Sequence, residues 1–309
     1  MRERAMRLRL EQAMKALLLT ETVKEVWDVL ARRNIDPVML KGLSSARHYR
    51  TAGDRPFGDV DLLISSEALR PAISMLEEVG FRVTGVDHSQ SVTAVGMSRA
   101  NEYLDLQTGL RRFTVEESRE ALNTQAILHL DDGREVRILP PYLEVRFLAV
   151  HALWHGISRP IWLCDLASIL NAKIIMDWNA VLADPLEVRS RVLSGIGLAH
   201  RLLGAPVPES LVAQAANVTS WLEPIVLHAW QTGEDHIFSV RKGRVLAQAV
   251  QSRDAQLFRH VVSNSWPTAL EAMNELNWPI DPKKTWASIL TCAAHRSWRL
   301  CSQLRHHLA

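Results

Sequence analysis

The stretch Gly58-Asp59-Val60-Asp61-Leu62-Leu63 places two carboxylates two residues apart among apolar side chains. Successive side chains of a β-strand point to opposite faces, so Asp59 and Asp61 share one face if this stretch is a strand. The apolar residues between and after them then face a hydrophobic core. Mg²⁺ fits such a pair of carboxylates, because it binds through one or two carboxylates together with substrate phosphates. An exposed strand with two hydrated acids explains the hexapeptide equally well.

A short apolar segment upstream, Val38-Met39-Leu40, predicts a strand that ends at Lys41 and Gly42. Gly42 allows a tight turn and a close approach of the backbone to a ligand. Ser44 or Ser45 is expected to begin the next helix, whose free N–H groups favour an anion. The predicted order is therefore a strand, a phosphate-sized turn, a helix, and a strand that carries two aspartates.

This order resembles the nucleotidyltransferase superfamily, which has a Gly-Ser turn and an Asp-x-Asp strand in a DNA polymerase β-like fold. It is similar, more narrowly, to a bacterial nucleotidyltransferase family whose members read Leu-Lys-Gly, then Arg, then Gly-Asp-hydrophobic-Asp-Leu-Leu. The chain has Leu40-Lys41-Gly42, Arg55 and the hexapeptide in that order. Trp162-Leu163-Cys164-Asp165-Leu166 is similar to a later pattern of the family, so the resemblance covers about residues 15–205.

The resemblance implies a third metal-binding carboxylate on a neighbouring strand. In the segment 102–107, alternation puts Tyr103, Asp105 and Gln107 on one face, and Asp105 is the candidate. Glu102 is a weaker alternative, and a plain exposed strand acid is another explanation of Asp105. Relatives often have His at the position of Gln107, so no role is carried over to that neighbour.

Nucleotidyl transfer is the reaction that the resemblance implies. One or two Mg²⁺ or Mn²⁺ ions would bridge the phosphates of an NTP, ATP included, and pyrophosphate would leave. The residues expected at the metal are Asp59, Asp61 and Asp105. The residues expected near the phosphates are Lys41, Gly42, Ser44, Ser45 and Arg55, with Lys41 or Arg55 offsetting negative charge.

The acceptor stays open at this point, because a small molecule, a peptide, a protein and an RNA all fit. A catalytically silent protein of the same fold, which binds a nucleotide or a partner, is the main alternative. A toxin-like nucleotidyltransferase acting on tRNA or protein is a third hypothesis. The formal net charge of +2 gives that third hypothesis no support.

The strand patterns occur only in the first half of the chain, up to a natural boundary at Pro140-Pro141. Beyond that point, helical spacing dominates. We therefore expect an α+β protein: residues 1–140 form a mixed β-sheet with flanking helices, and residues 141–309 form an α-helical domain. The expected elements include helices at 5–34, 43–50, 67–79 and 182–203, a turn at 87–89, and a hairpin at 127–139.

Composition narrows the class of protein further. Of the 309 residues, 47% are hydrophobic and 23% are charged, as in soluble globular proteins. The near-neutral charge makes no case for a general nucleic-acid or membrane binder, and no apolar run approaches the roughly 18 residues that span a bilayer. The chain has 3 cysteines, too few and too scattered for a disulfide framework, which predicts reduced thiols in a cytoplasmic protein.

His151 and His155 lie four residues apart on a predicted helix, a spacing that can bind zinc. The zinc protease motif needs a Glu directly after the first His, and Ala152 stands there. Packing is therefore the favoured role of both histidines. For Asp165 we favour a structural role over one at the site.

Overall fold

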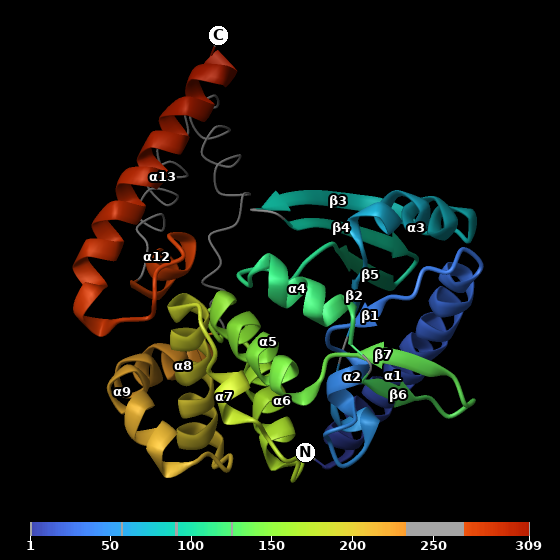
Figure 1. Ribbon diagram of the computed structural model, residues 1–309, viewed down its shortest axis with the longest axis horizontal. Coiled ribbons are helices and arrows are strands. Elements are labelled where there is room, and N and C mark those ends of the chain that lie inside the picture. Colours follow the sequence, from blue (N-terminus) through green and yellow to red (C-terminus); the bar gives the residue numbers. More distant parts are fainter. Residues whose placement is uncertain (1, 57, 90–91, 125, 233–268, 309) are drawn as a thin grey trace. The chain divides into compact units, whose positions relative to one another are not determined.

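The computed structural model describes residues 2–56, 58–89, 92–124, 126–232 and 269–308 (Figure 1). The chain divides into two compact units: residues 1–148 with 164–185, and residues 149–163 with 186–309. Residues 164–185 thus belong to the first unit together with the sheet. The predicted domain division at residue 140 stays a prediction.

A seven-stranded mixed sheet runs through the first unit in the order β3-β4-β5-β2-β1-β7-β6. β2 pairs in parallel with β5, and β1 pairs in parallel with β7, whereas the other neighbours are antiparallel. This sheet and its helices confirm the predicted α+β class. The strands are β1 (Val38–Met39), β2 (Val60–Leu63), β3 (Arg82–Ser89), β4 (Val92–Arg99), β5 (Glu102–Gln107), β6 (Ile127–His129) and β7 (Glu135–Ile138).

Helices flank the sheet, and they are the only regular elements in the described residues 141–232 and 269–308. The first unit holds α1 (Arg2–Ala31), α2 (Leu43–Ala46), η1 (Ala52–Asp54), α3 (Ser66–Glu78), α4 (Val115–Leu122) and α7 (Trp178–Val181). Two helices, α5 (Pro141–Trp154) and α6 (Pro160–Asn171), have residues in both units. The second unit holds α8 (Leu186–Leu203), α9 (Glu209–Thr232), α12 (Ala269–Glu275), η2 (Pro282–Lys284) and α13 (Thr285–Leu308).

The core of the first unit lies between one face of the sheet and the helices α1 and α3, which contact each other. Val60, Leu62 and Ile64 of β2 and its continuation are buried in this core, as the alternation predicts. Helix α3 begins where Ser65 accepts a hydrogen bond from the N–H of Ala68. Because the apolar residues of β2 face this core, the intervening Asp61 is directed to the other face of the sheet.

Three local expectations differ from the structure. Helix α2 is a single turn that ends at Ala46, not at residue 50. The turn expected at residues 87–89 is instead the end of strand β3. The helix expected from residue 182 begins only at Leu186, because Leu182 is the C-cap of α7 and a residue before a proline, here Asp184, disfavours helical backbone. The hairpin expected at 127–139 is present as β6 and β7.

The second unit is stabilised by close helix contacts. A Cβ atom added to Gly197 of α8 would lie 2.7 Å from the Cβ of Ala215 in α9, so glycine lets the two helices approach. The indole N–H of Trp230 donates to the carbonyl of Ile157 at 2.7 Å. Within the described ranges, no helix is long and apolar enough to cross a membrane.

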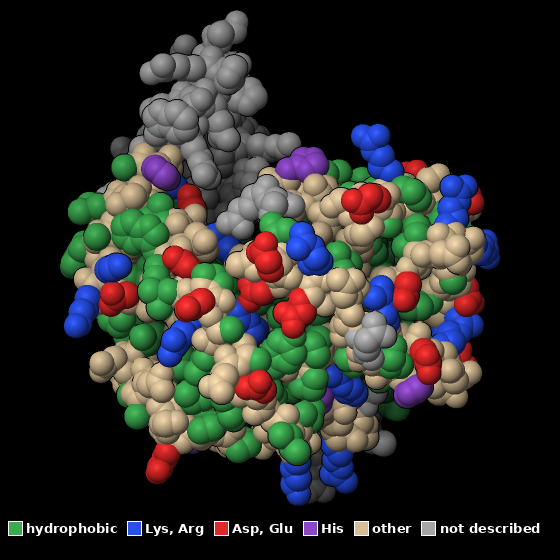
Figure 2. Space-filling model, viewed as in Figure 1, with side chains coloured by type: hydrophobic (Ala, Val, Ile, Leu, Met, Phe, Trp, Pro, Cys, Tyr) green, Lys and Arg blue, Asp and Glu red, His purple; other side chains and the backbone are tan. Residues whose placement is uncertain are grey.

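One face of the molecule carries described side chains of both charges (Figure 2). On the face seen in Figure 2, acidic and basic side chains alternate with apolar ones. This matches the formal net charge of +2.

Candidate active site

Two aspartates from different strands meet at the same level of the sheet. In the parallel pair β2–β5, Asp61 is the register partner of Asp105. Paired residues of adjacent strands point to the same face, so both carboxylates lie on the face opposite the core of α1 and α3. Asp59 lies two residues before Asp61, directly ahead of β2. The structure therefore brings the three predicted carboxylates to one region.

Lys41 enters this region from the next strand. Leu40 follows β1, and its N–H donates to the carbonyl of Asp61 at 3.0 Å. The ammonium group of Lys41 then lies 2.8 Å from Oδ2 of Asp61 and 3.4 Å from Oδ2 of Asp59. The side chains of Asp61 and Lys41 are 4% and 12% exposed, whereas that of Asp59 is 48% exposed. We call Lys41 and the three aspartates the carboxylate centre; it has a buried end at Asp61 and an open end at Asp59.

Burial controls the protonation of the centre. It raises the pKa of the Asp61 carboxyl to about 7; the charges of Asp59 and Asp105 add to this rise and Lys41 opposes it. Burial alone would lower the pKa of Lys41, but Asp61 and Asp59 outweigh it and hold that pKa above its usual value. The charge of Asp61 is therefore costly even beside an ammonium group.

Asp105 has partners of its own. The side-chain amide of Gln107 donates to Oδ2 of Asp105 at 3.1 Å. Burial raises the pKa of Asp105, while the positive charges of Arg111 and Lys41 oppose the rise. Arg111 itself forms an ion pair of 2.7 Å with Asp87 of β3. Gln107 thus takes part in the centre by orienting the third carboxylate.

The turn at Gly42 has the backbone that the sequence predicts. Its φ of 78° is a left-handed conformation that glycine adopts without strain. The helix begins at Leu43, the first residue of the expected range 43–50, so neither Ser44 nor Ser45 begins it; both lie inside α2 and are buried. The Ser44 hydroxyl contacts Glu144 at 3.4 Å, and that of Ser45 has no hydrogen-bond partner within the described structure.

Glu144 of α5 anchors the short helix α2. It is fully buried and pairs with Arg47 at 2.6 Å, while a ring nitrogen of His48 lies 3.2 Å away. Arg47 also donates to the carbonyl and hydroxyl of Ser44, at 2.8 and 2.7 Å. The position of the Gly42 turn therefore depends on an ionic contact to a helix about 100 residues later.

Arg55 is held by Asp165 of α6. Its Nε and Nη2 donate to the two carboxylate oxygens of Asp165 at 2.7 and 2.6 Å, a bidentate pair. The hydroxyl of Tyr49 donates to Asp165 at 2.7 Å. Asp165 is thus the counter-charge of Arg55, and the structural role favoured for it from the sequence stays a prediction. The positive charges of Arg55 and Lys41 and the negative charge of Asp59 act on one another here.

A scan against protein-family models matches residues 1–204 to the family described as uncharacterised nucleotidyltransferase. The chain belongs to this family. The match extends from α1 past the carboxylate centre and Asp165 to the end of α8. Neither the curated proteins nor the solved structures compared with the chain gave a match.

Because the chain belongs to a nucleotidyltransferase family, we ask whether the residues of the carboxylate centre could bind a divalent metal ion. Within the ranges that the structure describes, no three His, Cys, Asp or Glu side chains gather into a ready-made metal site. In the centre, Lys41 already contacts two of the three carboxylates. The donor chemistry nevertheless fits Mg²⁺ or Mn²⁺, because three aspartates share one face and Asp59 is open to water.

His151 lies in α5, and His155 directly follows the last residue of that helix, Trp154. The rings of His155 and Trp162 stack at 4.8 Å between centroids, and the rings of His151 and His155 lie 4.5 Å apart. Both histidines therefore pack in an aromatic group with Trp162, as favoured from the sequence.

Sequence reasoning missed the supporting residues of the candidate site. Arg111, Glu144 and Tyr49 act through contacts with residues far away in the chain, which no local pattern reveals. Gln107 carried a signal, since it lies on the same strand face as Asp105, but its difference from relatives argued against a role.

Proposed function

We propose that the protein is a metal-dependent nucleotidyltransferase that moves an NMP from an NTP to an acceptor hydroxyl or phosphate. The observation that carries this proposal is the register of Asp61 with Asp105, with Asp59 on the same strand segment. Membership of the nucleotidyltransferase family supports the general reaction. We include Mg²⁺ or Mn²⁺ as the cofactor in the proposal.

The proposal gives each part of the site a role. Asp59, Asp61 and Asp105 would hold the ion, which lowers the charge on the reacting phosphate and helps to activate the acceptor hydroxyl. The Gly42 turn would admit the phosphates to the backbone. Arg55, fixed by its bidentate pair, would add positive potential beside Asp59.

Ser44 and Ser45 would serve by shaping the turn, because their side chains are buried. Their hydroxyl groups would then not contact the phosphates directly. Both residues therefore act through the backbone in this proposal.

The finer parts of the function remain proposals. We take an NTP, ATP included, as the donor, and a small molecule, a peptide, a protein or an RNA as the acceptor. We propose neither a membrane nor nucleic acid in general as a partner, and we place the reaction in the cytoplasm.

One observation favours the second candidate, a silent protein that binds a nucleotide or a partner. Lys41 contacts both Asp59 and Asp61, so part of the negative charge that a metal needs is already neutralised. If this candidate is right, a nucleotide binds without any dependence on a divalent ion.

Calorimetry with each of the four NTPs, with and without Mg²⁺, tests the proposal. We expect the wild type to bind one of them only with Mg²⁺, and the double variant Asp59→Asn/Asp61→Asn to lose this binding. The matched control is Asp131→Asn/Asp132→Asn, which alters two neighbouring acids away from the centre and should bind as the wild type does. Binding that needs no Mg²⁺, or that survives in the Asp59/Asp61 variant, contradicts the proposal.

A further inference from the structure

Lys41 lies at the buried end of the carboxylate centre. Its ammonium group is closer to Asp61, at 2.8 Å, than to Asp59, at 3.4 Å. An ammonium group is a compact point charge with three donors, so it can bridge two carboxylates much as a small cation does. Strand β1 and the Gly42 turn fix the backbone on both sides of Lys41, and the charge is therefore tethered to the centre.

The other cations near the centre have carboxylate partners of their own. Arg55 forms its bidentate pair with Asp165, and Arg111 pairs with Asp87. Counted as ionised, the three aspartates of the centre carry −3 and Lys41 carries +1. The remaining charge of −2 equals the charge that one divalent ion neutralises.

The exposure of the side chains separates two ends of the centre. Asp61 and Lys41 are shielded from water, whereas nearly half of the Asp59 side chain is exposed. Mg²⁺ gives up its water reluctantly and keeps several water ligands in protein sites. A hydrated ion therefore fits the open end and not the end that Lys41 fills.

We propose that Lys41 is a built-in cation of the carboxylate centre, which takes the place of a metal ion at Asp61 and leaves room for one divalent ion beside Asp59 and Asp105. This inference rests on the proposed function and sharpens it in two ways. It selects a single ion, where the sequence allowed one or two, and it gives that ion to Asp59 and Asp105, with Asp61 held by Lys41. It also gives Lys41 a role toward the metal in addition to any contact with phosphates.

The test is a titration of Mn²⁺ into the protein without nucleotide, with free Mn²⁺ followed by electron paramagnetic resonance. We expect one bound Mn²⁺ per chain in the wild type. Lys41→Ala removes the charge and opens space at Asp61, so this variant should bind two. Lys41→Arg keeps a positive charge and should bind one.

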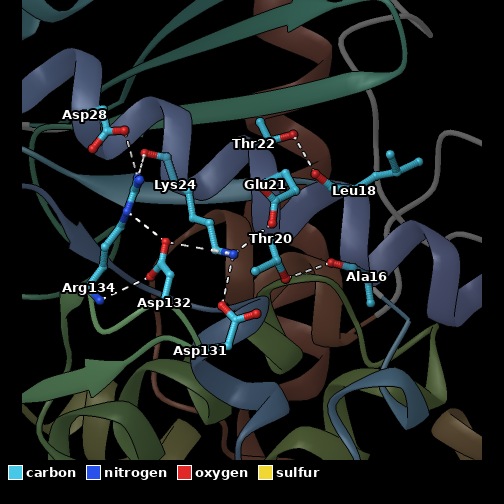
Figure 3. Close-up of polar contacts among 10 residues, drawn as sticks. All are labelled: Ala16, Leu18, Thr20, Glu21, Thr22, Lys24, Asp28, Asp131, Asp132 and Arg134. Carbon is cyan, nitrogen blue, oxygen red and sulfur yellow. Dashed lines mark hydrogen bonds and ion pairs between the residues drawn. The ribbon is translucent and has the colours of Figure 1, made fainter.

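Lys24 supplies a matched control. It lies 2.8 Å from Glu21 and 2.9 Å from Asp131, beside Arg134, which pairs with Asp28 and Asp132 (Figure 3). Lys24→Ala removes the same charge from a different group of acids and should leave one Mn²⁺ per chain. Thermal unfolding gives a second measurement: Mn²⁺ should restore the melting temperature that Lys41→Ala loses, and should not restore any loss in Lys24→Ala.

The possible outcomes separate this inference from the proposed function. Two ions in the wild type, or one ion of unchanged affinity in Lys41→Ala, overturn the inference and leave the proposed function in place. No Mn²⁺ in either protein overturns both. If Lys41→Ala does not fold, the wild-type count and Asp105→Asn decide: the inference requires one ion in the wild type and a loss of that ion in Asp105→Asn.

Discussion

The molecule surrounds a lysine with carboxylates in two places, around Lys41 and around Lys24. Both lysine side chains are 12% exposed, yet their partners differ. The Asp131 partner of Lys24 is 76% exposed, whereas the Asp61 partner of Lys41 is 4% exposed. The carboxylate of Asp131 beside Lys24 remains hydrated, whereas the carboxylate of Asp61 beside Lys41 is buried away from water.

The two groups also differ in what they connect. Lys24 of α1 pairs with Asp131, and Arg134 pairs with Asp28 of α1, so these ion pairs fasten helix α1 to the turn between β6 and β7 (Figure 3). Such a contact fixes the position of two elements and gains little from charge, because water screens it. The Lys41–Asp61 pair, in contrast, keeps charge in the interior, which costs desolvation free energy. A buried charge of this kind is typical of a site where the charge contacts a ligand.

The largest expected effect concerns stability. Lys41→Met removes one partner of a buried pair, and such a change costs about 3–5 kcal/mol of unfolding free energy. Uptake of a proton by Asp61 should bring the loss to the lower end of that range. Lys24→Met should change stability little, because its partners remain hydrated. Urea unfolding of the metal-free proteins measures both, and equal losses would remove the distinction between the two groups.

The next effect concerns the support of a carboxylate. Gln107→Leu removes the donor to Asp105, and loss of such a supporting hydrogen bond lowers metal affinity by about 10–100-fold. Gln107→His introduces the residue that relatives often have at this position. Because the imidazole can still donate a hydrogen bond to Asp105, the Mn²⁺ affinity of this variant should stay near that of the wild type. Mn²⁺ titration compares the two variants. An affinity of Gln107→Leu equal to the wild type would mean that Asp105 needs no orientation.

A smaller effect, the dependence of stability on salt, should also distinguish the acids around Lys24 from those around Lys41. At 1 M salt the screening length falls to about 3 Å, so exposed charges hardly interact while buried pairs are much less screened. The stability difference between the wild type and Lys24→Met should therefore vanish at 1 M NaCl. That between the wild type and Lys41→Met should persist. If the stability difference between the wild type and Lys41→Met also disappeared at 1 M NaCl, the Lys41–Asp61 pair would be exposed to solvent and not buried.

The sequence predicted the parts of the site that depend on local periodicity. Alternation along β2 and β5 sufficed for Asp61 and Asp105, because the two-residue period of a strand fixes which side chains share a face. The turn at Gly42 could be predicted because glycine adopts a positive φ without strain. The pattern of apolar residues gave the α+β class for the same reason.

Contacts between distant segments were not readable. Arg55 meets Asp165 across 110 residues, and Arg47 meets Glu144 across 97. Neither distance is linked to any period of a helix or strand, so only the packed chain decides these pairs. The predicted ends of α2 and β3 were wrong for a related reason, because tertiary contacts, more than local propensity, determine where short or weak elements end.

The last prediction concerns pH, where the two groups should respond with opposite sign. Burial raises the pKa of Asp61 to about 7, so the folded chain binds this proton more tightly than the unfolded chain does. The stability that Asp61 contributes is complete below about pH 4 and falls as the pH rises through 7. The hydrogen bond from Lys24 lowers the pKa of Asp131, so its contribution is complete above about pH 4 and falls in more acidic solution.

Unfolding of the wild type, Asp61→Asn and Asp131→Asn between pH 3 and 8 measures both trends. The advantage of the wild type over Asp61→Asn should shrink as the pH rises from about 4 to about 7. Its advantage over Asp131→Asn should shrink only below about pH 4, and by less, since Asp131 is exposed. Saturating Mn²⁺ favours the charged form of the centre and should flatten the first trend without altering the second. Trends of the same sign would mean that the acids around Lys41 and Lys24 share one environment, and that burial does not distinguish the carboxylate centre.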